Sequence, residues 1–278
     1  MARAPRSRPH FLLTGVGQAE PYTSPRIVIA GLPPARVRAA HAQRLGQAID
    51  QAIAGARQQL AARDQDLTDG ERGFYLEFKV PVAERAAVEG LENKTKRIEL
   101  VAVSPVQEGQ ETVSATVFVP ERSSDFYSRK IEAYRDENTR TGRPKNEALV
   151  ARLEDVQLAA VKSLFTDDLA LFPRLGQRIW WEVWLRDNRL ETFRRAAGRL
   201  NMALREHAIS FPERDVILAL SDEPTLSRLI ANTDAVAELR LAKDTPTLFL
   251  EMRTIEQADW VGDLVGRVVP PGPLAPAV

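Results

Sequence analysis

The chain has 278 residues, of which 44% are hydrophobic and 27% charged, the composition of a globular protein with enough apolar material for a core. Lysine plus arginine and aspartate plus glutamate each number 38, so no net charge attracts nucleic acid or an anionic membrane. The absence of cysteine excludes disulfides, thiol nucleophiles and cysteine-rich zinc sites, and it fits a reducing compartment.

The first fifteen residues, "MARAPRSRPHFLLTG", are basic, but their apolar stretch covers only residues 11–13. A secretory signal needs roughly 7–15 apolar residues, and a membrane span needs about 20. We therefore expect a cytoplasmic protein without a membrane partner. An organellar transit segment, indicated by the arginine-rich and acid-poor start, is the weaker alternative.

Residues 1–34 contain six prolines, which predict an extended arm, because proline fixes φ and removes a backbone donor. In the segment 35–69, apolar residues such as Leu45, Ile49 and Ile53 recur at three- and four-residue steps. This spacing predicts one long helix with a single apolar face.

The next stretch predicts the order β-α-β-β-α. Its predicted elements are a strand in "FYLEFKV", a helix in "VAERAAVEGLEN", strands in "IELVAVSPV" and "ETVSATVFVP", and a helix in "SSDFYSRKIEAYRDEN". Gly109 is expected at the hairpin turn, and Ser123 or Ser124 is expected to cap the last helix.

The basic connector "TRTGRPKN" precedes a predicted helix, "EALVARLEDVQLAAVKSLF", capped by Asn146. The β-α-β-β-α order then recurs in "IWWEVWLR", "RLETFRRAAGRLNMALRE", "HAISFPE", "RDVILALSD" and "EPTLSRLIANTDAVAELRLAK". Asp222 or Glu223 should open the last of these helices, with Pro224 in its first turn. A further helix is predicted in "TIEQADWVGDLVGRV".

The repeated order predicts an α+β protein with two ferredoxin-like (β-α-β-β-α) α/β sandwich units joined by helices, an extended N-terminal arm and a long N-terminal helix. The expected parts are an arm (1–34), a long helix (35–69), a first ferredoxin-like unit (70–140), a connector helix (141–176), a second ferredoxin-like unit (177–243), a C-terminal helical segment (244–269) and a proline-rich linker (270–278).

Candidate chemical groups are few. The three histidines, His10, His41 and His207, lack metal-ligand spacing, so structural or surface roles are favoured. The adjacent Asp167 and Asp168 could hold Mg²⁺, although a helix-end cap is the more common role. The connector cations could touch phosphate, although a solvated loop is favoured: Arg140, Arg143 and Lys145. No cofactor or metal is expected.

The strand "IWWEVWLR" carries large apolar rings on both faces. Ile179, Trp181, Val183 and Leu185 should face one side, and Trp180 and Trp184 the other. A sheet covered on both sides is the favoured explanation; the alternative is that Trp180 and Trp184 mark a surface for docking a partner domain. Without a GxSxG elbow, a Walker loop or a Ser-His-Asp set, the residues indicate a binding, folding or regulatory module rather than an enzyme.

Nearly the whole chain resembles the N-terminal region of a bacterial family of subtilisin-like serine peptidases. The matching stretches are "RPHFLLTG", "AEPYTSP", "LENKTKRIELVAV", "ATVFVPE", "FYSRKIEAYRDENTRTGRPKNEALV", "SLFTDD" with "ALFP", "IWWEVWL", "SFPERDVILA", "AELRLAKDTPTLFLEM" and "QADWVGDLV". In that family such a region is similar in position to a prodomain, and members look to be encoded beside an AAA-type ATPase, a pairing associated with defence against phage.

The resemblance implies a non-catalytic, prodomain-like or regulatory module that assists folding of, inhibits or docks the peptidase domain. The aspartate, histidine and serine motifs of subtilases are absent from these residues, so no catalytic residue is assigned. The expected partners are the peptidase domain in cis and an AAA ATPase. Ordinary subtilisin prodomains are single β-α-β-β-α-β units, so one unit, more plausibly the second, is expected to lay its sheet on the peptidase domain.

The closing run, "GRVVPPGPLAPAV", is expected to lead into that peptidase domain, with any processing site upstream of Ala277. The expected junction residues are Pro270, Pro271, Pro273, Pro276, Ala277 and Val278. The alternative to this whole interpretation is a stand-alone adaptor that binds protein through ferredoxin-like sheets. RNA ranks lower as its ligand, because the strands "IELVAVSPV" and "ATVFVPE" lack the aromatic pair that RNA-binding sheets present.

Overall fold

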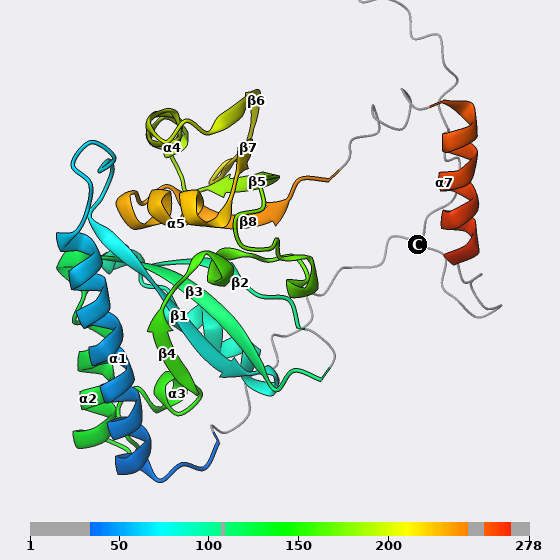
Figure 1. The fold of residues 1–278 in the computed structure, drawn as a ribbon. Coiled ribbons are helices and arrows are strands. Elements are labelled where there is room, and N and C mark those ends of the chain that lie inside the picture. The colour runs from blue at the N-terminus through cyan, green and yellow to red at the C-terminus, as the bar shows by residue number, and fades with distance from the viewer. Residues whose placement is uncertain (1–33, 107–108, 244–252, 268–278) are drawn as a thin grey trace, which may run out of the picture. The chain divides into compact units, whose positions relative to one another are not determined.

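A computed structural model describes residues 34–106, 109–243 and 253–267 (Figure 1). These residues form two four-stranded antiparallel sheets and six α-helices, so the protein is an α+β protein. All the described residues belong to one compact unit, Leu32–Val278. The predicted arm and the junction residues 270–278 lie outside the described residues.

The first sheet follows the long helix α1. Its elements are, in chain order, α1 (Arg38–Ala61), β1 (Gly73–Pro81), the 3-10 helix η1 (Val82–Leu91), η2 (Lys94–Lys96), β2 (Glu99–Val103), β3 (Thr112–Pro120), η3 (Glu121–Ser123), α2 (Phe126–Asp136), α3 (Glu147–Val150) and β4 (Asp155–Leu158). The strands lie in the order β2-β3-β1-β4, and every neighbouring pair is antiparallel.

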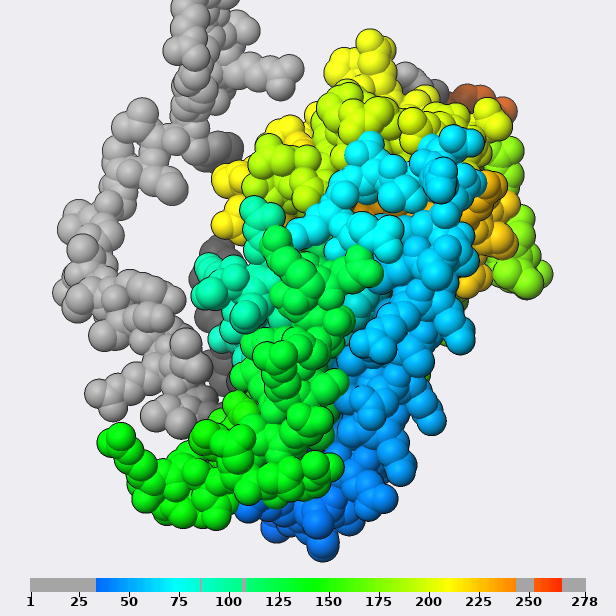
Figure 2. All heavy atoms as spheres, turned by 90° about the vertical axis from the view of Figure 1, so that its left-hand side faces the viewer, coloured from blue at the N-terminus to red at the C-terminus, as the bar shows by residue number. Residues whose placement is uncertain are grey.

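Alternation along β1 creates the first core. Phe74, Leu76, Phe78 and Val80 are buried on one face, where they pack with the apolar faces of α1 and α2. The two helices lie on the same side of this sheet (Figure 1), and the space-filling view shows α1 in blue beside the green segment that contains α2 (Figure 2). Arg38 of α1 ties them further by donating to the carbonyl oxygens of Tyr134 and Glu137.

The second sheet repeats this arrangement. Its elements follow η4 (Val161–Leu164) and η5 (Leu169–Leu171) and are β5 (Ile179–Leu185), α4 (Leu190–Arg199), β6 (Ala203–Ser210), β7 (Asp215–Ser221), α5 (Glu223–Asn232) and β8 (Val236–Leu241); α7 (Thr254–Arg267) comes later in the chain. The order is β6-β7-β5-β8, again antiparallel throughout. Trp181, Val183 and Leu185 of β5 pack with Phe193 of α4 and Leu226 of α5 in a second core.

Two predicted helices are wrong, because each contains a strand. The segment expected to be a connector helix after Asn146 forms only the short α3, then β4 and η4. In β4, Val156 enters the first core while Gln157 faces the opposite side, and both pair with the edge of β1. Helix α5 likewise stops at Asn232, because the residues after it pair with β5 as β8. Edge pairing overrides local helix propensity in both places.

Smaller differences concern element ends. The segment 82–91 is a 3-10 helix rather than an α-helix, and α4 ends at Arg199 so that β6 begins earlier than predicted. Asp125 occupies the N-cap position of α2 without a capping hydrogen bond from its side chain, whereas Ser123 donates to the carbonyl of Lys96. The helix predicted near the C-terminus is present as α7, Gly109 adopts a positive φ of 80° at the hairpin, and Asp222 caps α5.

The second face of the first sheet is covered by the second half of the chain. Tyr75 donates from its hydroxyl to the carbonyl of Val236 at 2.7 Å, and Thr116 donates to the carbonyl of Ser163 at 2.6 Å. Phe118 is buried in the second core. The first sheet is therefore a central layer with both faces packed.

Candidate functional site

The second sheet has one face that its helices do not cover. On β5, Trp180, Glu182 and Trp184 lie opposite to the buried Trp181 and Val183, and both outer tryptophans are partly exposed. We call this surface the tryptophan face, and it consists of Trp180, Glu182, Trp184, Arg205, Phe211, Leu218, Leu220, Glu238 and Arg240. The strand register places Leu220 and Leu218 beside Trp180 and Glu182. The sequence prediction that the two outer rings share one face of the strand is confirmed.

Arginines and a phenylalanine pack against the two rings. The guanidinium of Arg205 lies 4.6 Å from the centre of the Trp180 ring, and that of Arg240 lies 4.9 Å from the Trp184 ring. Phe211 stacks on Trp184 with centroids 5.6 Å apart and an interplanar angle of 10°. Cation–π and stacked contacts of this kind are individually worth about 0.5–2 kcal/mol. The face is therefore ordered by its own side chains before any partner arrives.

The polar groups of the face also have partners. The indole nitrogen of Trp184 donates to Glu182 at 2.7 Å, while Glu238 accepts hydrogen bonds from Arg240 and from the hydroxyl of Thr166. Phe211 nevertheless remains 50% exposed. Aromatic and arginine side chains held in this way suit recognition of another surface rather than bond-making chemistry.

Other residues singled out in the sequence have structural roles. Asp167 accepts a hydrogen bond from the backbone N–H of Leu241 at 2.8 Å, and Asp168 accepts one from that of Ala170 at 2.9 Å. Within the described residues, no cluster of three or more histidine, aspartate and glutamate side chains could hold a metal ion. The two aspartates therefore stabilise local backbone.

The two described histidines and the basic connector lie on different elements of the fold. His41 is buried and its Nε2 lies 3.0 Å from the carbonyl oxygen of Val150; burial, reinforced by two nearby arginines, lowers its pKa. His207 is exposed on β6, and His10 lies outside the described residues. In the connector, Lys145 pairs with Glu137 at 2.5 Å. None of the described residues named in this paragraph is among those that make up the tryptophan face.

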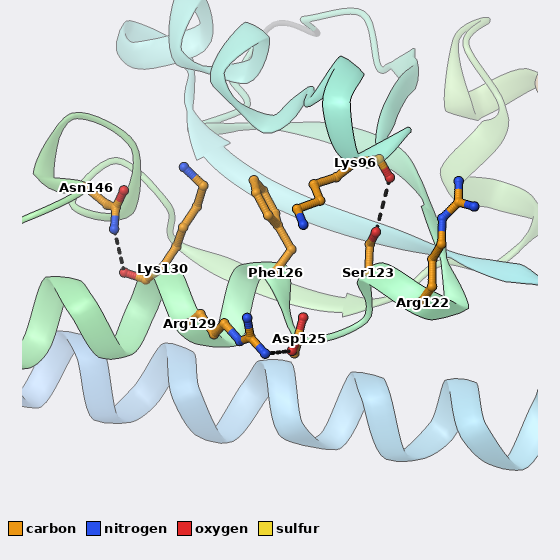
Figure 3. A pocket seen from close by; sticks show the side chains of 8 residues that line it. All are labelled: Lys96, Arg122, Ser123, Asp125, Phe126, Arg129, Lys130 and Asn146. Atoms are coloured by element: carbon orange, nitrogen blue, oxygen red, sulfur yellow. Dashed lines mark hydrogen bonds and ion pairs between the residues drawn. The ribbon is translucent and has the colours of Figure 1, made fainter.

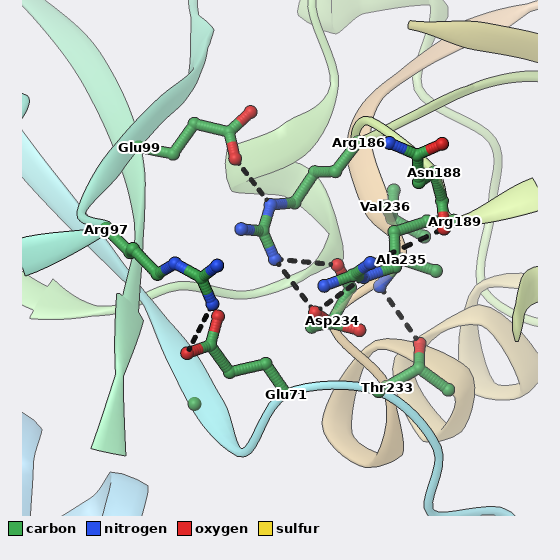
Figure 4. Close-up of polar contacts among 12 residues, drawn as sticks. Glu71, Arg97, Glu99, Arg186, Asn188, Arg189, Thr233, Asp234, Ala235 and Val236 are labelled. Carbon is green, nitrogen blue, oxygen red and sulfur yellow. Dashed lines mark hydrogen bonds and ion pairs between the residues drawn. The ribbon is translucent and has the colours of Figure 1, made fainter. Parts of the chain in front are cut away.

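Sequence reasoning missed a buried charge cluster where the two sheets meet. Arg186, directly after β5, donates to Glu99 of β2 at 2.7 Å, and to the Asp234 carbonyl at 3.0 Å and carboxylate at 3.2 Å (Figure 4). Its guanidinium lies 3.8 Å from the ring centre of Phe118. Arg189 donates to the same Asp234 carboxylate at 2.7 Å. Asp234 and Glu99 lie 48 and 87 positions from Arg186 in the sequence, so no local periodicity could have predicted these pairs.

The surroundings of Arg186 favour its charged form. Burial acts to lower the pKa of Arg186, but the neighbouring Tyr75, Glu99 and Asp234 outweigh burial and raise it. Burial raises the pKa of Tyr75, so its hydroxyl stays protonated. Among the described groups, Oδ1 of Asp234 and Nη1 of Arg63 are buried without a hydrogen-bond partner. A cleft of about 590 Å³ adjoins the cluster, and its cations and carboxylates are balanced along the lining. We interpret the cluster as a structural junction.

Comparisons of the chain with models of protein families, with curated proteins and with solved structures found no match. In the part of the chain that the structure describes, no helix has the length and apolar character needed to cross a membrane. A functional proposal therefore rests on the strand order, on the tryptophan face and on the resemblance in sequence.

Proposed function

We propose that the two sheets belong to two ferredoxin-like units. Each runs β-α-β-β-α-β along the chain, with η1 in place of the first helix in the first unit. Counted within its own unit, each sheet has the strand order 2-3-1-4. Split βαβ connections of this kind define the ferredoxin-like arrangement.

We further propose that the region is a non-catalytic, prodomain-like or regulatory module of a subtilisin-like serine endopeptidase. It docks on the peptidase domain and assists its folding or inhibits it. The resemblance of the stretches quoted above to the N-terminal regions of that peptidase family supports this proposal. An AAA ATPase encoded beside the peptidase is the second proposed partner, in a cytoplasmic system that defends bacteria against phage.

One observation carries the choice of docking surface. The helix-free face of the first sheet is used internally, because Tyr75, Thr116 and Phe118 are each no more than 4% exposed. The helix-free face of the second sheet instead presents the partly exposed Trp180 and Trp184. Tryptophan and arginine are the residues that most often dominate binding energy at protein interfaces. The peptidase domain is therefore proposed to contact the second unit.

The test adds the 278-residue chain to the separately expressed peptidase domain and measures binding, refolding yield and peptide hydrolysis. We expect saturable binding, with either a higher yield or slower hydrolysis. Trp184→Ala should weaken binding at least about tenfold, since central tryptophans at interfaces contribute about 2 kcal/mol or more. Leu175→Ala is the control, because this side chain is 80% exposed and lies off the tryptophan face.

Two results would oppose the proposal. Binding that is equal for the unchanged chain and for both Trp180→Ala and Trp184→Ala would exclude the tryptophan face as the docking surface. Unchanged yield and unchanged hydrolysis at saturating amounts of the chain would exclude both the folding and the inhibitory role.

The alternative is an adaptor, and one observation favours testing RNA with it. The structure places two tryptophans and two arginines on one sheet face, the combination on which single-stranded RNA stacks. However, each ring is already contacted by an arginine, and the carboxylates of Glu182 and Glu238 on the same face repel phosphate. A protein partner is therefore favoured. Saturable quenching of tryptophan fluorescence by an RNA oligonucleotide, lost in Trp184→Ala, would support the RNA-binding adaptor instead.

A further inference from the structure

A basic pocket lies in the first unit, at the beginning of α2. It has a volume of about 230 Å³, and its lining comes from η2, η3, the start of α2 and the N-cap position of α3. Figure 3 shows the lining side chains. The lining residues are Lys96, Arg122, Ser123, Asp125, Phe126, Arg129, Lys130 and Asn146. Four of these side chains are cations and one is a carboxylate, so the pocket is strongly positive in a chain whose formal net charge is zero.

Two of the four cations lack a compensating carboxylate. Arg129 pairs with Asp125, and Arg122 pairs with Glu71 at 2.9 Å. Within the described residues, no carboxylate pairs with Lys96 or with Lys130. The pocket therefore presents two ammonium groups that no described acidic side chain neutralises.

Lys130 is partly buried and packs against an aromatic ring of the pocket. Its ammonium lies 5.0 Å from the ring centre of Phe126, and the view into the pocket shows this ring between Lys130 and Lys96 (Figure 3). Burial lowers the pKa of Lys130, as expected for an ammonium that has lost part of its hydration without gaining a counter-charge. An anion in the pocket would reverse this loss.

The segments that carry these groups are fixed to one another. Ser123 donates from its hydroxyl to the carbonyl of Lys96 at 3.1 Å, and Asn146 donates from its amide to the carbonyl of Lys130 at 3.3 Å. Helix α2 begins at Phe126 without a side-chain cap, so the positive end of its dipole adds to the field of the lysines. The site is thus preorganised, which limits the entropy lost on binding.

We propose that this pocket binds the phosphate group of a small phosphorylated molecule. Its volume is below the roughly 300–1,000 Å³ of sites that enclose a whole drug-sized ligand, so it suits a compact anionic group with the rest of the ligand outside. The dianionic charge of a phosphomonoester matches the two unpaired lysines. A nucleic-acid backbone is disfavoured, because its charge repeats along a strand and the chain has no net positive charge to attract it. This site is distinct from the tryptophan face and does not depend on the proposed function.

The test is a calorimetric titration of the 278-residue chain with inorganic phosphate at low ionic strength. We expect a dissociation constant of about 1 mM or tighter. Lys96→Gln and Lys130→Gln should each weaken binding about tenfold, because each removes a charge-assisted contact. Lys94→Gln is the matched control: Lys94 lies in the same 3-10 helix as Lys96 and is exposed, but does not line the pocket. Circular dichroism spectra verify that all three variants fold.

Two further measurements identify the class of ligand and the lysine that binds it. Adenosine monophosphate that binds more tightly than phosphate would indicate a nucleotide, whereas equal affinities would indicate recognition of the phosphate alone. Phosphate should also raise the pKa of Lys130 measured by NMR. The proposal is overturned if phosphate does not bind, or if Lys94→Gln weakens phosphate binding as much as the two pocket variants do. It is also overturned if a single-stranded oligonucleotide binds more tightly than phosphate and adenosine monophosphate, and if all three substitutions weaken this oligonucleotide binding equally.

Discussion

Replacing Arg186 by methionine tests whether the charge cluster holds the two sheets together. Arg186 is 7% exposed, and its guanidinium links Glu99 of the first sheet to Asp234 beside the second. Methionine preserves most of the volume of the stem, which limits the packing change. It removes both ion pairs and the contact with the ring of Phe118.

The expected loss of unfolding free energy is about 3–5 kcal/mol, the usual result of removing one partner from a buried ion pair. Two features favour the lower end of that range. Arg189 still pairs with Asp234 at 2.7 Å, and Arg214 still pairs with Glu99 at 2.7 Å. The lost cation–π contact with Phe118 acts in the opposite direction, because a desolvated contact of this type is worth up to about 2 kcal/mol.

Thermal and urea unfolding monitored by circular dichroism measure this change. For a chain of this size each kcal/mol shifts Tm by about 2–4 °C, so we expect Arg186→Met to lower it by about 6 °C or more. Arg194→Met is the control, since its pairing with Glu191 at 3.0 Å is exposed and should contribute less than about 0.5 kcal/mol. A loss below about 1 kcal/mol for Arg186→Met, or a loss equal to that of the control, would refute the role of the cluster.

Two other substitutions test the packing of the first sheet. Gly73→Ala should lower the unfolding free energy by about 1–3 kcal/mol, because its Cβ would lie 2.3 Å from the buried ring of Phe118, whereas Gly198→Ala in α4 meets nothing within 4 Å and should be neutral or stabilising in the same urea titration. Glu77→Gln should cost about 1–3 kcal/mol at neutral pH, since three side-chain hydrogen bonds to the buried carboxylate are disturbed. Burial acts to raise the pKa of Glu77, but the three hydrogen bonds outweigh burial and hold this pKa below the ordinary 4.5. The stabilisation by the Glu77 carboxylate is therefore present above pH 4.5 and is lost as the pH falls through the folded-state pKa. If the difference in unfolding free energy between the unchanged chain and Glu77→Gln does not shrink on acidification, this reasoning is contradicted.

Period-two patterns in the sequence predicted the central strands well. In β5 the large rings alternate so regularly that the faces of Trp180, Trp181 and Trp184 could be assigned from the residues alone. The edge strands β4 and β8 were missed for a physical reason. Their residues have helix-forming composition, and what decides their structure is the unpaired backbone of the neighbouring strand, β1 or β5.

The candidate sites differ in the same way. The shared face of Trp180 and Trp184 was predictable, because it follows from the alternation along β5. The arginines that contact the two rings were not, because they come from β6 and β8. The basic pocket was not predictable either, because it combines η2, η3, the start of α2 and the N-cap position of α3, and their approach depends on how the helices pack. The charge cluster likewise depends on the packing of one sheet against the other, which no local pattern records.

The two sheets share a strand order, but their helix-free faces differ in the contacts that an external partner would have to displace. On the first sheet, Glu77 accepts hydrogen bonds from Ser114, Gln157 and Ser163, and Thr116 donates to a backbone carbonyl. A partner could reach this face only by separating the two halves of the chain, which would break those buried hydrogen bonds and leave polar groups unpaired.

On the second sheet, the described residues that lie over the two tryptophans are long side chains rather than a packed layer. Arg205 and Arg240 lie over Trp180 and Trp184 through contacts that can be exchanged for equivalent contacts with a partner. Moving an arginine aside costs a cation–π contact, about 0.5–1 kcal/mol at exposed sites, while burying a tryptophan ring at an interface contributes more. The proposed docking is placed on the second unit because of this difference between the two helix-free faces. The strand order does not distinguish the units, since both sheets share it. Replacement of Arg205 and Arg240 by alanine should therefore leave binding of the peptidase domain much less affected than Trp184→Ala, and equal losses would mean that charge rather than ring burial governs the interface.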